Sequence, residues 1–309
     1  MSGRHQVRTL DVRPSRNRWL NRSAAPDHSG VTHFASYDGT QLAFRTRGTG
    51  RPLLCLPGGP GLTPDYLGDL GGLAGSRQLV MLAVRGTGAS AVPADPASYR
   101  CDAMVGDVEA LRAHLGLERM DLLGHSAAAN LAALYAASYP DRLGHLVLLT
   151  PGLRALGLEP TDEELLAATE RRSDEPWYPA AREAILAAVA GVDTTENTRT
   201  YLPFYYGRWD DAARAHAVME FEGRVPAVEA GYYADGAFDP SATRAALAGL
   251  AVPVLVYAGE VDLAPTPEAA AQAAGLFPRG ELTVQPGGGH FPWLDDPALF
   301  SAAITGFLG

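Results

Sequence analysis

The sequence predicts an α/β protein with a mostly parallel sheet, helices on both faces of the sheet and an inserted helical lid. Short apolar stretches alternate with stretches of helical spacing along most of the chain, as in sheets whose strands are joined by helices. The alternation stops between residues 153 and 249, where no stretch has the pattern of a strand. A length of 309 residues with 47% hydrophobic residues is sufficient for one large core.

The expected elements can be justified in chain order. Asp38-Gly39 separates two stretches, 31–37 and 41–46, and an Asp-Gly pair in this place is typical of a β-hairpin. The remaining strands are short apolar runs, and the helices carry apolar residues three or four positions apart. Strands are expected at 52–56, 79–84, 120–123, 146–149, 252–257 and 281–285, and helices at 101–115, 127–138, 267–276 and 297–308.

These elements divide the chain into three parts. Residues 1–22 contain six arginines, one aspartate and no apolar run, so we expect 1–25 to be a flexible tail and not a secretory signal. Residues 26–152 and 250–309 form the α/β core, and residues 153–249 form the lid. The lid is rich in aromatic residues, which we expect partly to form its own core and partly to roof a pocket. They include Trp177, Tyr201, Phe204, Tyr205, Tyr206, Trp209, Tyr232 and Tyr233.

The turn between the strand at 120–123 and the helix at 127–138 carries a candidate nucleophile, Ser126. The sequence Gly-His-Ser-Ala-Ala at 124–128 has the form G-x-S-x-A, one methyl group away from the nucleophile elbow G-x-S-x-G. On such a turn the serine hydroxyl stands clear of the sheet, and backbone N–H groups at the helix start face the same space. A simpler interpretation is that Ser126 only caps the helix. The catalytic interpretation requires a base, an acid and an oxyanion hole elsewhere.

Two loops that follow late strands supply the base and the acid. Asp262 comes after the strand at 252–257, and His290 comes after the strand at 281–285. A serine hydroxyl is a weak nucleophile, so an imidazole must take its proton and a carboxylate must hold the imidazole. The chain order Ser126, Asp262, His290 is the order that accompanies a nucleophile elbow. A single aspartate or histidine in a loop is usually only solvated, but both lie in the expected loops.

A glycine-rich turn after the strand at 52–56 supplies the candidate oxyanion hole. Pro-Gly-Gly-Pro-Gly at 57–61 allows backbone N–H groups to approach a developing negative charge without interference from side chains. We expect the two donors to be the N–H groups of Gly59 and Ala127. Taken alone, the motif would be an ordinary turn.

Other chemistries are disfavoured. A net charge of −10 argues against a nucleic-acid partner, and no run of 18 apolar residues exists to span a membrane. All 25 basic residues are arginine, which excludes a Schiff-base lysine, and no spacing typical of metal ligands is present. Residues 86–91 fit G-x-G-x-x-A, but Pro93 and Pro96 interrupt the helix that a dinucleotide site needs. We therefore expect a cytoplasmic enzyme with no cofactor and no metal.

With these motifs, residues 30–309 resemble the α/β-hydrolase superfamily and, within it, the proline iminopeptidase branch of the serine aminopeptidases. Residues 57–61 correspond to the branch's motif His-Gly-Gly-Pro-Gly, and residues 85–90 correspond to its motif Arg-Gly-x-Gly-x-Ser. Several positions depart from the branch. Pro57 replaces the histidine, Ala83 replaces the aspartate of Asp-x-Arg-Gly, and His125 and Ala127 stand where glycine and tryptophan are common.

The resemblance also implies a substrate site on the lid. Acidic residues of the branch bind the free α-amino group of the substrate, and the corresponding residues here are Asp210 and Glu229. We expect the aromatic residues Tyr205, Trp209 and Tyr232 to contribute to the same site. Alternatively, Asp210 caps the helix at 211–222 and Glu229 is an exposed surface residue.

Three functions are compatible with these observations. The first is an aminopeptidase that forms an acyl-enzyme and releases a small N-terminal residue, such as proline, from a small molecule or short peptide. The second is an esterase or lactonase with the same triad and a small acyl substrate. The third is a ligand-binding protein without activity, which would have no need of Ser126, Asp262 and His290 together.

Overall fold

The computed structural model describes residues 30–192 and 194–309, so the tail expected at 1–25 lies outside the described part. The strands lie where the apolar runs predict them. They are β1 (Val31–Ala35), β2 (Gln41–Arg47), β3 (Pro52–Leu56), β4 (Gln78–Ala83), β5 (Met120–His125), β6 (Leu143–Leu149), β7 (Val254–Gly259) and β8 (Gly280–Gln285).

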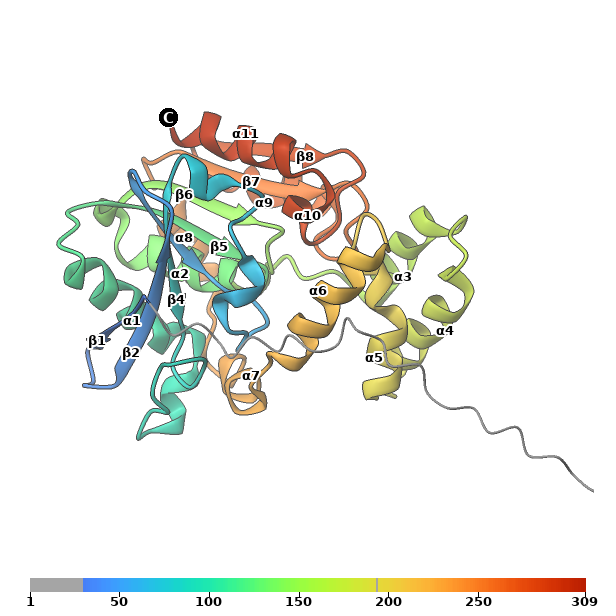
Figure 1. The fold of residues 1–309 in the computed structure, drawn as a ribbon, viewed down its shortest axis with the longest axis horizontal. Coiled ribbons are helices and arrows are strands. Elements are labelled where there is room, and N and C mark those ends of the chain that lie inside the picture. The colour runs from blue at the N-terminus through green and yellow to red at the C-terminus, as the bar shows by residue number, and fades with distance from the viewer. Residues whose placement is uncertain (1–29, 193) are drawn as a thin grey trace, which may run out of the picture. The chain divides into compact units, whose positions relative to one another are not determined.

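The eight strands form one sheet in the order β1-β2-β4-β3-β5-β6-β7-β8 (Figure 1). The pairs β1/β2 and β2/β4 are antiparallel, and every other pair is parallel. The predicted mostly parallel sheet is therefore confirmed. Strand β5 pairs with β3 and β6, so the residues at its carboxyl end lie in the middle of the sheet.

Helices follow or precede the strands as expected, and further helices occupy the segment between β6 and β7. None of the helices at 30–192 and 194–309 is long and apolar enough to cross a lipid bilayer. The helices are α1 (Cys101–His114), α2 (Ala128–Ser138), α3 (Asp162–Thr169), α4 (Tyr178–Val189), α5 (Thr195–Tyr201), α6 (Asp211–Glu222), α7 (Pro226–Tyr232), α8 (Pro240–Leu247), α9 (Pro267–Ala274), α10 (Pro292–Asp295) and α11 (Pro297–Leu308).

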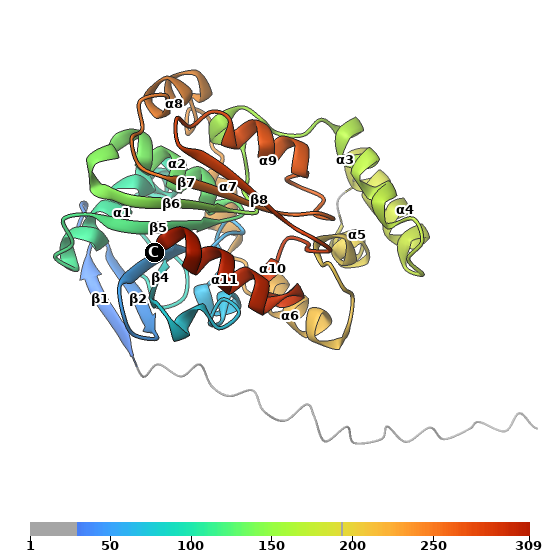
Figure 2. The same ribbon diagram turned by 90° about the horizontal axis from the view of Figure 1, so that it is seen from above.

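The sheet separates two hydrophobic clusters, because successive strand residues point to opposite faces. In β3, Leu54 and Leu56 belong to one cluster with residues of α1, α2 and α9. Leu53 and Cys55 belong to the other cluster with residues of α11. Figure 2 shows α8 and α9 on one side of the sheet and α10 and α11 on the other. Coverage of both faces explains why the central strands are apolar at nearly every position.

The described part of residues 153–249, the predicted lid, contains the helices α3–α8 and no strand. Helices α3, α4 and α5 gather beyond the carboxyl ends of the strands (right in Figure 1). Leu247 of α8, in contrast, is fully buried in the same cluster as α1 and α2. The exact limits of the lid remain a prediction.

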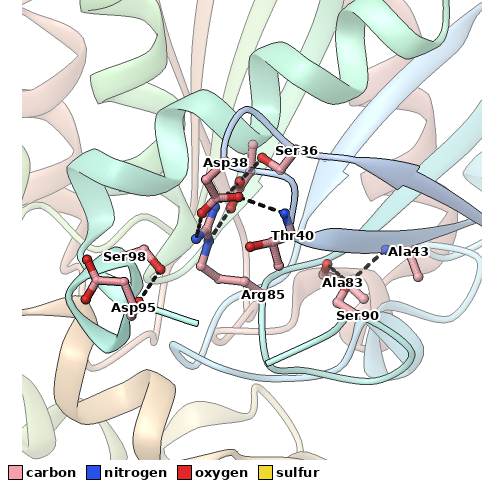
Figure 3. A network of polar contacts seen from close by, with 10 residues as sticks. Ser36, Asp38, Thr40, Ala43, Ala83, Arg85, Ser90, Asp95 and Ser98 are labelled. Atoms are coloured by element: carbon pink, nitrogen blue, oxygen red, sulfur yellow. Dashed lines mark hydrogen bonds and ion pairs between the residues drawn. The ribbon is translucent and has the colours of Figure 1, made fainter. Parts of the chain in front are cut away.

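A buried polar network ties the antiparallel edge of the sheet to α1 (Figure 3). The side chain of Arg85, which follows β4, is fully buried and donates hydrogen bonds to Asp107 of α1 and to Asp38 in the β1–β2 turn. The Ser36 hydroxyl also donates to Asp107. A buried guanidinium needs such charge-assisted partners. Arg85, which is part of the motif at 85–90, therefore contributes to the fold.

The same network predicts how acid affects stability. Partial burial opposes ionisation of Asp38, but hydrogen bonds from Arg85 and Thr40 outweigh it and lower the pKa of Asp38 to about 2. A carboxylate whose pKa is lowered by folding stabilises the protein above its unfolded pKa of about 3.9, and this contribution is lost as the pH falls through its folded pKa. We expect the unfolding free energy to fall more steeply with acid in the wild type than in Asp38→Asn. Urea denaturation at a series of pH values measures this, and parallel curves would contradict it.

Candidate active site

The turn between β5 and α2 holds Ser126 in a strained conformation. Its φ is +54°, in the left-handed region that residues with side chains rarely adopt. The Ser126 N–H donates to Leu149 O at 2.9 Å, and the Ser126 carbonyl accepts from Gly152 N at 2.9 Å. A Cβ at Gly124 would lie 2.6 Å from Ala128 O, so the turn requires glycine there. This is the local geometry that the sequence predicts for a nucleophile elbow.

The structure brings together the three residues predicted as a triad. The Ser126 Oγ lies 2.8 Å from His290 Nε2, and His290 Nδ1 lies 2.8 Å from Asp262 Oδ2. Asp262 is fully buried in the loop after β7, and His290 is 7% exposed in the loop after β8. With its proton on Nδ1, His290 donates to the carboxylate and accepts from the serine hydroxyl. This arrangement can transfer a proton away from Ser126.

The expected oxyanion donors lie close to the same serine. Ala127 directly follows Ser126, and Gly59 lines a cavity that also contains Ser126. The loop that carries Gly59 approaches the turn closely, because a Cβ at Gly58 would lie 2.8 Å from the Ser126 Cβ. Gly59 itself has a φ of +114°, which favours glycine. The use of their N–H groups as oxyanion donors stays a prediction.

The cavity above Ser126 has a volume of about 230 Å³. Core residues that include Ser126, His290 and Phe291 line it. Lid residues also line it and contribute both aromatic and charged side chains. These lid residues are Thr198, Tyr201, Leu202, Tyr205, Glu220 and Arg224.

Of the three aromatic residues predicted to bind substrate, Tyr205 lies in the cavity wall. Its ring centroid is 5.5 Å from that of His290, and its carbonyl accepts a hydrogen bond from His290 N at 2.7 Å. Trp209 is outside the cavity lining and packs on Tyr206. Tyr232 is also outside the lining, and its hydroxyl donates to Ala127 O at 2.8 Å.

The two acidic residues predicted to bind an ammonium group are also outside the cavity lining. Asp210 caps α6, because its Oδ1 accepts from Ala213 N at 2.9 Å. Glu229 is 46% exposed and lies 3.6 Å from Arg224 Nη1. Binding of substrate by either residue stays a prediction.

A charged pair that is absent from the residues predicted from the sequence lies in the cavity wall. Glu220 of α6 is 7% exposed at its side chain and lies 2.5 Å from Arg224 Nη2. Burial lowers the pKa of Arg224, but Glu220 and Glu229 outweigh this and raise it, so the guanidinium stays charged. The i,i+4 spacing of Glu220 and Arg224 is the one sequence signal that could have found the pair.

The segment at 224–232 of the lid contacts the loop that carries Gly59 and the turn that carries Ser126. Arg224 forms an isolated antiparallel bridge with Leu62, and Val225 N donates to Gly61 O at 3.1 Å. On the other side, the Tyr232 hydroxyl holds the Ala127 carbonyl. Tyr232 thus anchors the turn that carries Ser126.

Among the described residues, no three His, Cys, Asp or Glu side chains are grouped so that they could hold a metal ion.

Comparison with known proteins gives consistent matches. Residues 51–297 match the protein family described as alpha/beta hydrolase fold. A proline iminopeptidase of Levilactobacillus brevis is 31% identical over 273 residues, which are 83% of this chain and 88% of that protein. A proline iminopeptidase structure from Mycobacterium smegmatis matches with a TM-score of 0.68 and 24% identity, over 90% of this chain and 97% of that one. An esterase from Exiguobacterium antarcticum matches with a TM-score of 0.68 and 18% identity, over 90% and 98% of the two chains.

Proposed function

The chain belongs to the α/β-hydrolase fold family and is a hydrolase with proline iminopeptidases among its relatives, and on this premise we propose that it is a serine hydrolase whose nucleophile is Ser126. The observation that carries the proposal is the pair of 2.8 Å contacts from Ser126 to His290 and from His290 to Asp262. The strained turn at Ser126 supports it, because strain of this kind gathers at functional sites.

The proposed reaction passes through an acyl-enzyme. The Ser126 Oγ attacks the substrate carbonyl carbon while His290 Nε2 takes the hydroxyl proton. The N–H groups of Gly59 and Ala127 stabilise the resulting oxyanion. The bond to the leaving group then breaks as His290 returns the proton to the departing amine or alcohol. Water, activated by His290 in the same way, releases the acid and restores Ser126.

The substrate class that we propose is an N-terminal aminoacyl group with a free amine. The pocket carboxylate Glu220 and the neighbouring Glu229 share the single guanidinium of Arg224, so this cluster keeps one negative charge for an ammonium group. A cavity of about 230 Å³ is smaller than the roughly 300–1,000 Å³ of drug-sized pockets, which favours a small residue such as proline. Glu220 joins Glu229 in this proposal, whereas the resemblance to proline iminopeptidases gives the ammonium-binding role to Asp210 and Glu229.

The ion pair between Glu220 and Arg224 also favours a second candidate, an esterase or lactonase. A carboxylate that already has a cationic partner 2.5 Å away does not require a charged substrate. A neutral acyl group could occupy the cavity beside Tyr201, Leu202 and Tyr205, and the same triad would cleave its ester bond.

Substitution of the pocket carboxylate separates the two candidates. We expect Glu220→Gln to lower kcat/KM for aminoacyl anilides with a free amine by ~10–100-fold, the effect of losing one charged hydrogen bond. Hydrolysis of a neutral aryl ester, and of anilides with a blocked amine, should change little. Glu229→Gln is expected to show the same pattern. The measurement is steady-state kinetics on the three substrates.

Glu222→Gln is the matched control, because Glu222 lies on the same helix but is exposed. It should leave all three activities unchanged. Equal losses on amine and ester substrates in Glu220→Gln would indicate a folding defect instead of a lost ammonium site. No loss on any substrate, together with faster turnover of esters by the wild type, would favour the esterase.

A further inference from the structure

His125, the residue before the nucleophile, is buried among three loops of the site. It is 1% exposed. Its Nδ1 lies 2.7 Å from the Tyr66 hydroxyl, and its Nε2 lies 3.0 Å from the carbonyl of His290. The Tyr66 hydroxyl in turn accepts from the Gly58 N–H at 2.7 Å. One chain of hydrogen bonds therefore runs from Gly58 through Tyr66 and His125 to His290.

One end of this chain fixes a proton on His125. The His290 carbonyl can only accept, so His125 Nε2 carries a proton. In the neutral ring Nδ1 is then an acceptor, so the Tyr66 hydroxyl donates to it while the Tyr66 oxygen accepts from the Gly58 N–H. A protonated ring would instead donate from both nitrogens. Burial lowers the pKa of His125 well below its ordinary value, and the nearby His290 and His216 rings add to this.

The surroundings of His125 leave it little freedom to move. Its ring centroid lies 4.9 Å from that of Trp293 in an edge-on contact and 5.1 Å from that of His290. The His290 carbonyl also accepts from the Thr150 hydroxyl at 2.9 Å. The main chain at His290 is thus fixed from two directions, and one of them is the His125 ring.

We propose that His125 is a positioning residue. It fixes the positions of the oxyanion loop, the nucleophile turn and the loop of the catalytic base relative to one another. The chain of hydrogen bonds reaches each of these segments: Gly58, which bonds Tyr66, precedes the expected donor Gly59; His125 itself precedes Ser126; and His290 is the proposed base. The inference rests on the proposed serine hydrolase mechanism. It assigns a role to a position where the sequence departs from the proline iminopeptidase pattern.

The test is a comparison of His125→Leu with His125→Gln. Leucine removes both hydrogen bonds, and we expect kcat to fall by ~10–100-fold with KM nearly unchanged, because small displacements of catalytic groups have effects of this size. The rate of labelling by a fluorophosphonate should fall in parallel. A glutamine amide offers one acceptor and one donor about as far apart as the two ring nitrogens, so His125→Gln should recover most of kcat.

Two further variants make the comparison decisive. Tyr66→Phe breaks the same chain at its next member, so its loss in kcat should not add to that of His125→Leu. His145→Leu removes another histidine of the sheet, which bonds Asp121 Oδ1 at 2.9 Å and lies outside this chain of hydrogen bonds. It should lose stability and keep kcat within about threefold.

Each outcome has a separate meaning. An unchanged kcat in His125→Leu, or an equal loss in His145→Leu, would overturn the positioning role while leaving the triad untouched. Failure of the proposed mechanism itself would show as activity and labelling that survive Ser126→Ala, whatever the His125 variants do.

Discussion

Ser126→Ala is expected to lower kcat by about 10⁴- to 10⁶-fold while the chain remains folded, because the proposed acyl-enzyme cannot form without the hydroxyl. A fluorophosphonate should label the wild type at one site and fail to label the variant. Steady-state kinetics and intact-mass spectrometry after labelling measure both effects. Circular dichroism checks that the variant is folded.

Ser138→Ala is the matched control, since Ser138 is an exposed serine at the end of the same helix α2. It should keep full activity and full labelling. Labelling of any residue other than Ser126, or activity of Ser126→Ala within a factor of ten of the wild type, would rule out the triad.

The second large effect is expected for Asp262→Asn, which should lower kcat by about 10⁴-fold at neutral pH. An asparagine can present its amide N–H groups to His290 and favour the tautomer whose Nε2 carries the proton and cannot accept from Ser126. Because Asp262 is fully buried, no water replaces the lost acceptor. Steady-state kinetics at neutral pH measure the loss.

Glu260→Gln provides the comparison within the same loop. Glu260 is exposed and accepts a hydrogen bond from Gly287 N at 2.7 Å. It should change kcat by less than about threefold, as expected for a surface substitution. Similar kinetics for Asp262→Asn and Glu260→Gln would mean that Asp262 has no part in catalysis.

The sheet and the proximity of Ser126, Asp262 and His290 could be predicted from the sequence, because both follow from the order of the strands. Ser126, Asp262 and His290 each follow a parallel strand, and the carboxyl ends of parallel strands meet at one edge of a sheet. Recognition of β5, β7 and β8 from their apolar runs was therefore sufficient to bring these residues together. The boundary errors are small: β5 continues to His125, and β6 begins at Leu143.

The lid could not be predicted in the same way. Its helices do not alternate with strands, so nothing in the local sequence indicates which face of α6 turns toward the nucleophile. That orientation brings Glu220 into the cavity wall and leaves Asp210 as a helix cap. The hydrogen bonds of His125 also could not be predicted from the sequence, because its partners Tyr66 and His290 are 59 and 165 positions away in the chain.

The attachment of residues 224–232 to the oxyanion loop limits how substrates can enter the cavity. Movement of this segment away from the core would break the bond from Val225 to Gly61 and the bond from Tyr232 to Ala127. Such a motion would distort the oxyanion hole each time a substrate enters. The cavity wall at Tyr205 is attached in the same way, because the Tyr205 carbonyl accepts from the N–H of the proposed base His290 at 2.7 Å. Opening of the lid at either attachment would therefore interrupt catalysis, so we expect the preformed size of the cavity to decide which substrates enter.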